Sequence, residues 1–208
     1  MPSSEISEFR AVRERTLSLV AGLSADDMAE QPAADRWSAG EILDHLLRSE
    51  TLWRNEVSEL VRLARAGRQT YLSRLITDFP LPIVGRLPPP LLGLMSVPLT
   101  VFSSFFPLSV FLAFLKWRKI PAQAPPAIAP RRGRTADELR DDLSAQAERT
   151  VAVFEDNDDL RFERLIYQHP LLGIVTAVDL LQVITTHEAR HQEQLVEVLA
   201  ALGVRGRP

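Results

Sequence analysis

Two histidines, His187 and His191, stand one helical turn apart near the carboxyl end of the chain. The surrounding stretch, residues 176–202, has apolar residues at helical spacing and is typical of one long amphipathic helix. Residues at positions i and i+4 lie about 5–6 Å apart at Cβ, so both imidazoles can bind one metal ion. The alternative is a pair of core histidines that hydrogen-bond to their neighbours, and the spacing alone leaves both interpretations open.

A third histidine, His45, lies in another stretch with helical apolar spacing, residues 38–67. Ser38 and Glu41 have the spacing of a capping box at the start of this helix. His45 falls on the apolar face, so a core shared with the later helix would bring it to the histidine pair. Three neutral nitrogen ligands leave one coordination position open for water or substrate, which is typical of catalytic metal sites.

The elements that must position these histidines are four helices, predicted at residues 4–22, 38–67, 135–156 and 176–202. No convincing run of alternating residues indicates strands. The sequence therefore predicts an all-α protein, a four-helix bundle that occupies residues 1–208 as one domain. A long insertion, at about residues 68–130, separates the second helix from the third.

Composition narrows the classes of function. The net charge is −3, which gives no basic footprint for nucleic acid. The chain has no cysteine, so disulfides, thiolate ligands and a thiol nucleophile from the protein are excluded. The amino-terminal stretch lacks the pattern of a signal peptide, so we expect a cytoplasmic protein.

The insertion contains a segment without any charge, residues 87–115, which runs from Leu87 to Leu115. It is long enough to cross a bilayer, where about 20 apolar residues suffice, but its prolines interrupt helical hydrogen bonding. Basic residues flank both ends, which favours a hairpin or an interfacial segment over a simple span. We expect it to contact a membrane surface, to form a homodimer contact, or to fold over the protein's own core.

Three blocks of the sequence, WSAGEILDHL at 37–46, HPLLG at 169–173 and HEARHQEQL at 187–195, together resemble the DinB-like superfamily of metalloenzymes. The resemblance implies a divalent metal, commonly zinc or nickel, bound by His45, His187 and His191. It also implies relatives that transfer low-molecular-weight thiols, and others that act as isomerases or hydrolases. The charge-free insertion departs from the family pattern.

The string His187-Glu188-Ala-Arg-His191 also fits the motif of zinc peptidases, in which Glu188 would be the general base. Such enzymes commonly take a third ligand from well downstream. No histidine follows His191, so His45 is the better third ligand. Glu188 is therefore a weaker candidate for a catalytic role than the histidines are for a metal site.

Two glutamates are candidates for outer partners that orient the ligands, Glu41 one turn before His45 and Glu56 on the same helix face. Either could equally be a solvated surface group. The fourth histidine, His169, precedes a proline in a predicted connection, and we expect it to be a turn or rim residue rather than a ligand.

The leading hypothesis is a divalent-metal-dependent enzyme that acts on a small-molecule substrate. The resemblance to the DinB-like superfamily implies a low-molecular-weight thiol as the second reactant. A metal lowers the pKa of a bound water or thiol and so supplies a nucleophile near neutral pH. The alternative is a non-catalytic protein, membrane-associated or partner-binding, in which the metal is structural or absent.

Overall fold

The computed structural model describes residues 1–74, 108–109, 112–113, 126–169 and 172–204. Most of the predicted insertion, including nearly all of the charge-free segment 87–115, lies outside these residues. Within that segment, Leu108 and Leu112 are described, and both pack against buried core residues. None of the helices in the described part of the chain is both long enough and apolar enough to cross a membrane.

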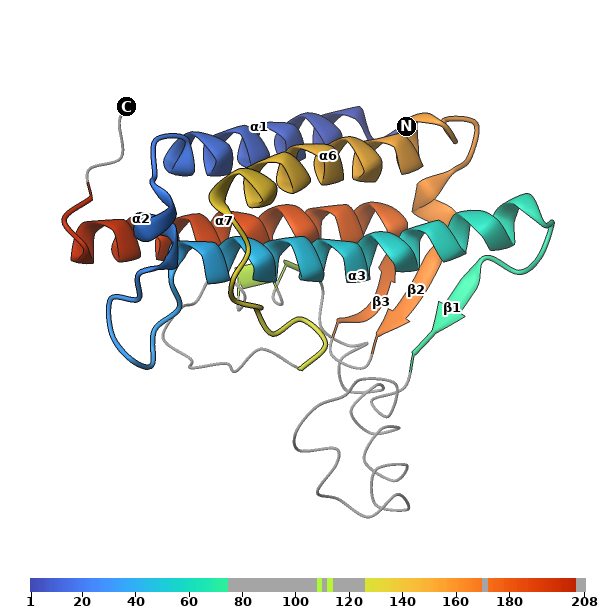
Figure 1. The fold of residues 1–208 in the computed structure, drawn as a ribbon. Helices are drawn as coiled ribbons and strands as arrows, with labels where there is room; N and C mark the ends of the chain where they lie inside the picture. Colours follow the sequence, from blue (N-terminus) through green and yellow to red (C-terminus); the bar gives the residue numbers. More distant parts are fainter. Residues whose placement is uncertain (75–107, 110–111, 114–125, 170–171, 205–208) are drawn as a thin grey trace, which may run out of the picture.

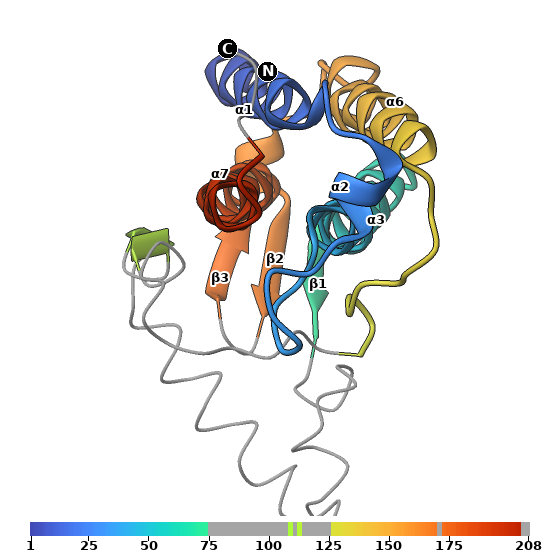
Figure 2. The ribbon, with the colours of Figure 1, turned by 60° about the vertical axis from the view of Figure 1, so that its left-hand side comes forward.

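Four long helices lie side by side and form most of the structure (Figures 1 and 2). α1 and α3 each pack against both α6 and α7. A short helix, α2, connects α1 to α3 and packs on α3. The helical prediction is confirmed in this coarse form. Among the residues that the structure describes, the α-helices are α1 (Ser3–Val20), α2 (Ala25–Ala29), α3 (Ala39–Arg65), α6 (Ala136–Glu155) and α7 (Ala177–Ala201).

Side chains fix where the helices begin. Ser38, Thr135 and Thr176 precede α3, α6 and α7, and each accepts a hydrogen bond from the backbone N–H three residues later. The acidic residue at that position accepts the cap residue's own N–H in return, which completes a capping box. Gly203, with a φ of 69°, follows α7 in the left-handed conformation that commonly ends a helix.

The core consists of two adjoining groups of apolar residues. One contains Phe9, Phe154 and Phe162, whose side chains are almost completely buried, and the ring centroids of the last two lie 4.7 Å apart. The other joins the first half of α3 and the second half of α7 to residues of α2, α6 and the end of α1, and within it Leu43 and Leu195 have no exposed surface. Burial of this second group holds the two histidine-bearing helices together.

The all-α prediction is wrong in one respect, because the chain also forms a small three-stranded sheet in the order β1-β2-β3. β1 pairs with β2 in parallel, and β2 pairs with β3 antiparallel. Strands of three or four residues are too short to produce a recognisable alternation, which explains the error. The strands are β1 (Tyr71–Ser73), β2 (Ile166–His169) and β3 (Gly173–Thr176).

The sheet lies on the side of α3 and α7 away from α1 and α6 (Figure 1). Thr176 is both the last residue of β3 and the cap of α7, so the sheet fixes where α7 begins. Gly173 opens β3 with a φ of 74°, a conformation that glycine adopts at little cost. The strands thereby set the position of the helix that carries two of the three histidines.

The cap of α3 gives a test of this account. Replacing Ser38 with Ala removes the acceptor for the Glu41 N–H, so we expect a loss of about 1 kcal/mol in the free energy of unfolding, measured with urea at pH 7. Ser58→Ala, in the exposed middle of the same helix, is the matched control and should change stability by less than about 0.5 kcal/mol. Equal effects of the two substitutions would contradict the capping role.

Candidate metal centre

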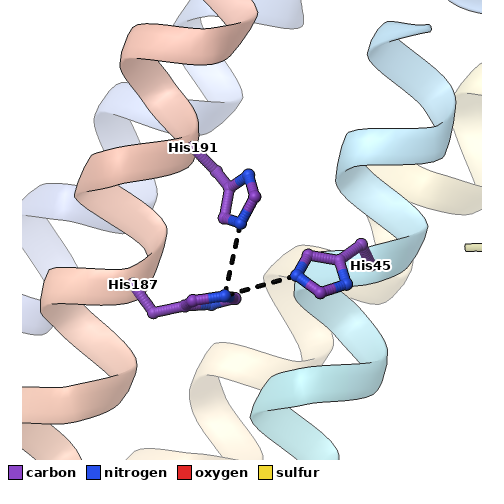
Figure 3. Close-up of side chains that lie close together, drawn as sticks. All are labelled: His45, His187 and His191. Atoms are coloured by element: carbon purple, nitrogen blue, oxygen red, sulfur yellow. Dashed lines mark hydrogen bonds between the residues drawn. The ribbon is translucent and has the colours of Figure 1, made fainter. Parts of the chain in front are cut away.

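The structure brings His45 from α3 together with His187 and His191 from α7 (Figure 3). The Nε2 atom of His187 lies 3.3 Å from Nε2 of His45 and 3.2 Å from Nε2 of His191. One ligand atom from each ring lies within 4.8 Å of the others. All three rings therefore present nitrogen atoms to one small volume between the two helices.

The opposite ring nitrogens have partners that determine the tautomers. Nδ1 of His45 lies 2.7 Å from the carbonyl oxygen of Ile128, and Nδ1 of His191 lies 2.8 Å from Oε1 of Gln194. Carbonyl oxygens only accept hydrogen bonds, so each Nδ1 must carry the proton and donate it. The Nε2 atoms of both rings then carry lone pairs.

His187 has a weaker partner in Ser49. The Ser49 hydroxyl donates to the backbone oxygen of His45 at 2.8 Å, which leaves its own oxygen as an acceptor for Nδ1 of His187 at 3.5 Å. In the tautomer with its proton at Nδ1, His187 also presents a lone pair at Nε2. In that tautomer the three Nε2 lone pairs face one another with no proton to share, which suits the arrangement to a cation.

The distances fit a metal ion. Nitrogen ligands about 2.0–2.1 Å from one zinc ion at tetrahedral angles lie roughly 3.3–3.4 Å apart. The two Nε2–Nε2 distances from His187, 3.2 and 3.3 Å, are close to that separation, and the ligand atoms of all three rings lie within 4.8 Å of one another. The residues present thus fit a divalent metal by donor type, tautomer and spacing.

Burial keeps two of these imidazoles neutral. It lowers the pKa of His45, although the hydrogen bond to Ile128 opposes the shift in part. The pKa of His187 lies well below the usual value because of burial first, and then because of the charges of His191, His45 and Arg190. Neutral imidazole is the form that binds metal. Trp37 covers the site from one side, with its ring centroid 4.9 Å from that of His45.

Glu188 does not take the position that a general base of this site would need. Its carboxylate accepts two hydrogen bonds from Arg13 at 2.8 Å and one from Thr16 at 2.6 Å, both residues of α1. The side chain is buried on the face of α7 that meets α1. Burial alone would lower the pKa of Arg13, but hydrogen bonds and charges from Glu188 and Glu50 outweigh it and raise that pKa.

The two glutamates proposed as outer partners are also bound elsewhere. Glu41 completes the cap of α3 and accepts a hydrogen bond from Arg132 at 2.8 Å. Glu56 forms an ion pair with Arg74 at 2.9 Å. Neither carboxylate orients a histidine, because each is held by a cap or by an arginine of a neighbouring segment.

The actual outer partners of the rings were missed by sequence reasoning. Gln194 follows His191 by three residues, so helical spacing would have found it. Ser49 lies on α3 but contacts the ring of His187 on α7, a pairing that spacing within one helix does not give. Ile128 contributes a backbone oxygen from the segment before α6. A contact through the backbone does not require a particular residue type, so the sequence gives no sign of it.

His169 lies apart from this cluster, as its sequence context predicts. It ends β2, where its buried ring accepts a hydrogen bond from the Leu172 N–H at 3.2 Å and lies 5.4 Å from Trp53. Burial lowers its pKa to about 3, so the ring stays neutral in the folded protein over most of the acid range.

His169 should make the protein sensitive to acid. An unfolded chain binds a proton at this histidine below about pH 6.5, whereas the folded chain does not until about pH 3, so stability falls as the pH drops between these values. Lowering the pH from 7 to 5 reduces the free energy of unfolding of the unaltered protein partly through this histidine. In His169→Asn that part is absent, so the reduction should be smaller by about 2 kcal/mol. Urea unfolding in the presence of a chelator measures this difference, and equal losses would contradict it.

Comparison with known proteins agrees with the site. The sequence model of the DinB superfamily matches residues 8–195, a span that includes all three histidines. The chain is 24% identical over 197 residues to the uncharacterized protein YuaE of Bacillus subtilis (strain 168), covering 93% of this chain and 96% of that protein. No solved structure matches the chain significantly. Because the family match spans nearly the whole chain, the protein belongs to the DinB superfamily.

Proposed function

We propose that this protein is a divalent-metal-dependent enzyme in which His45, His187 and His191 hold one zinc or nickel ion. The observation that carries the proposal is the convergence of three histidine Nε2 atoms, with Nε2 separations of 3.2 and 3.3 Å around His187. We further infer that the four long helices act as a four-helix bundle with the metal in its interior, where bundles commonly build such sites.

The residues around the ligands prepare them for binding. The Ile128 carbonyl and the Gln194 side chain hold protons at Nδ1, which fixes ring orientation and makes Nε2 a better donor. Trp37 packs against His45 and His191 and limits access of water from that side. When bound, the metal supplies Lewis acidity at its open coordination position and lowers the pKa of a water or thiol there.

A small thiol suits this site better than a peptide bond. Glu188, the carboxylate that a peptidase-like mechanism would use as base, is bound to Arg13 and Thr16. A thiol has a pKa of about 8.5, so it needs far less assistance to lose its proton than water does. The chain has no cysteine, so the sulfur must come from a second reactant. In the proposed transfer the thiolate forms a carbon–sulfur bond, and a leaving group departs with its electron pair.

Metal binding is the first test. The purified protein should bind one divalent ion per chain, measured by elemental analysis and by competition with a chromophoric chelator. Each of His45→Ala, His187→Ala and His191→Ala removes a direct ligand. Each should weaken binding by more than the 10–100-fold typical of losing an outer partner.

His169→Asn is the matched control for these variants, since it changes a buried histidine outside the cluster. It should keep the full metal content. If the unaltered protein binds no divalent metal, or if His169→Asn loses it while the three alanine variants do not, the proposed site is incorrect.

The reaction class has a separate test. A metal-loaded sample should be incubated with an electrophilic substrate panel, with and without small thiols, and products should be identified by mass spectrometry. We expect thioether products that require both thiol and metal, with a rate that rises with pH through one ionisation near neutrality. Hydrolysis products that form equally well without thiol would assign the protein to hydrolysis instead. A tightly bound metal with no turnover of any substrate would favour the non-catalytic alternative.

A further inference from the structure

A second polar cluster lies buried behind the metal centre. Its charged members are Arg13 of α1, Glu50 of α3 and Glu188 of α7, with exposed fractions of 3%, 2% and 1%. The metal site proposed above uses none of them. Charged groups this deeply buried are rare unless they are paired, so their arrangement requires an explanation.

One nitrogen atom joins the two carboxylates. Nη2 of Arg13 lies 2.6 Å from Oε2 of Glu50 and 2.8 Å from Oε2 of Glu188. The separation of the two carboxylates is therefore limited by two hydrogen bonds to the same atom. The other terminal nitrogen of Arg13 donates to the backbone oxygen of Leu143 in α6, so one side chain contacts all three neighbouring helices.

Further hydrogen bonds hold this cluster in place. Thr150 of α6 donates to the second oxygen of Glu50, and Thr16 of α1 donates to Glu188. Gln192 of α7 donates both to Thr16 and to the backbone oxygen of Val12. The carboxylates of Glu50 and Glu188 are thus fixed from both sides rather than free to follow small movements of their helices.

Each carboxylate is adjacent in sequence to a group at the metal centre. Glu188 directly follows His187. Glu50 directly follows Ser49, whose hydroxyl bonds to the backbone of His45 and lies 3.5 Å from Nδ1 of His187. A constraint on the distance between the two carboxylates is therefore a constraint on the distance between the turns that carry the ligands.

We propose that Arg13 is a positioning residue for the metal centre: by binding Glu50 and Glu188 through one nitrogen, it holds α3 and α7 at the separation at which the three histidines converge. This inference rests on the proposed function. Without Arg13, two carboxylates would face each other in a region of low dielectric constant and repel. A buried ion pair is weak evidence for stability, because apolar side chains of similar volume often stabilise a fold as well or better. An apolar replacement could match the free energy of this ion pair, but it would not reproduce the fixed separation of the two carboxylates.

The test replaces the whole charged cluster at once. Arg13→Met combined with Glu50→Gln and Glu188→Gln removes all three charges and the shared nitrogen, so no carboxylate is left unpaired in the core. Val151→Ala, in the buried face of α6, is the matched control, because it lowers stability from a helix without ligands. Thermal unfolding, zinc affinity and the visible absorption spectrum of the cobalt-loaded protein are measured for each.

We expect the triple variant to bind zinc at least about 10-fold more weakly and to show a changed cobalt spectrum, as loss of an outer constraint does elsewhere. Val151→Ala should unfold at a lower temperature with unaltered zinc affinity and spectrum. A folded triple variant with the affinity and spectrum of the unaltered protein would overturn the inference. The inference would also be overturned if Val151→Ala lost zinc affinity in proportion to its loss of stability.

If the triple variant does not fold, Arg13→Lys decides the question. It keeps the positive charge, but its single nitrogen cannot replace the three nitrogens through which Arg13 bonds Glu188, Glu50 and the backbone of Leu143, so it should weaken zinc binding and alter the cobalt spectrum. Unchanged binding in Arg13→Lys would overturn the inference. Failure of the unaltered protein to bind any metal would instead defeat the proposed function, so the two outcomes are distinguishable.

Discussion

Three imidazole lone pairs directed at one point are the constraint on which the site depends. In water each would be solvated, but here the rings are held between two packed helices and their Nδ1 positions are already bonded. In the tautomer with every proton at Nδ1, nitrogens about 3.2–3.3 Å apart repel one another unless a cation lies between them. The rest of the fold must supply the energy that keeps them together, and a metal ion would convert that repulsion into binding.

That energy comes from apolar packing, and the accuracy of the arrangement comes from polar contacts. Leucines of α3 and α7 bury their side chains beside the triad and hold the helices in contact. Caps at Ser38 and Thr176 fix where each helix begins, and β3 runs directly into α7. The Arg13 cluster then limits how far the two helices can separate.

Much of this was predictable from residue pattern, for a physical reason. Helix starts depend on neighbours within four residues, so the boxes at Ser38 and Thr135 could be identified in advance. The helical spacing of apolar residues around His45 also predicts that this side chain lies on an inward face. The sheet could not be predicted, because β1 and β2 are short and pair across a long stretch of chain. The partner of Glu188 could not be predicted either, because Arg13 lies at the other end of the sequence.

The central claim is that the three histidines bind one divalent metal through nitrogen. X-ray absorption spectroscopy of the zinc-loaded protein tests it most directly, because it reports the atoms around the metal itself. The account predicts three imidazole nitrogens at about 2.0–2.1 Å together with one exchangeable water oxygen. In the His191→Ala variant one imidazole should be lost from the signal. A zinc ion surrounded only by oxygen atoms, or an imidazole signal that is unchanged in His191→Ala, would contradict the account.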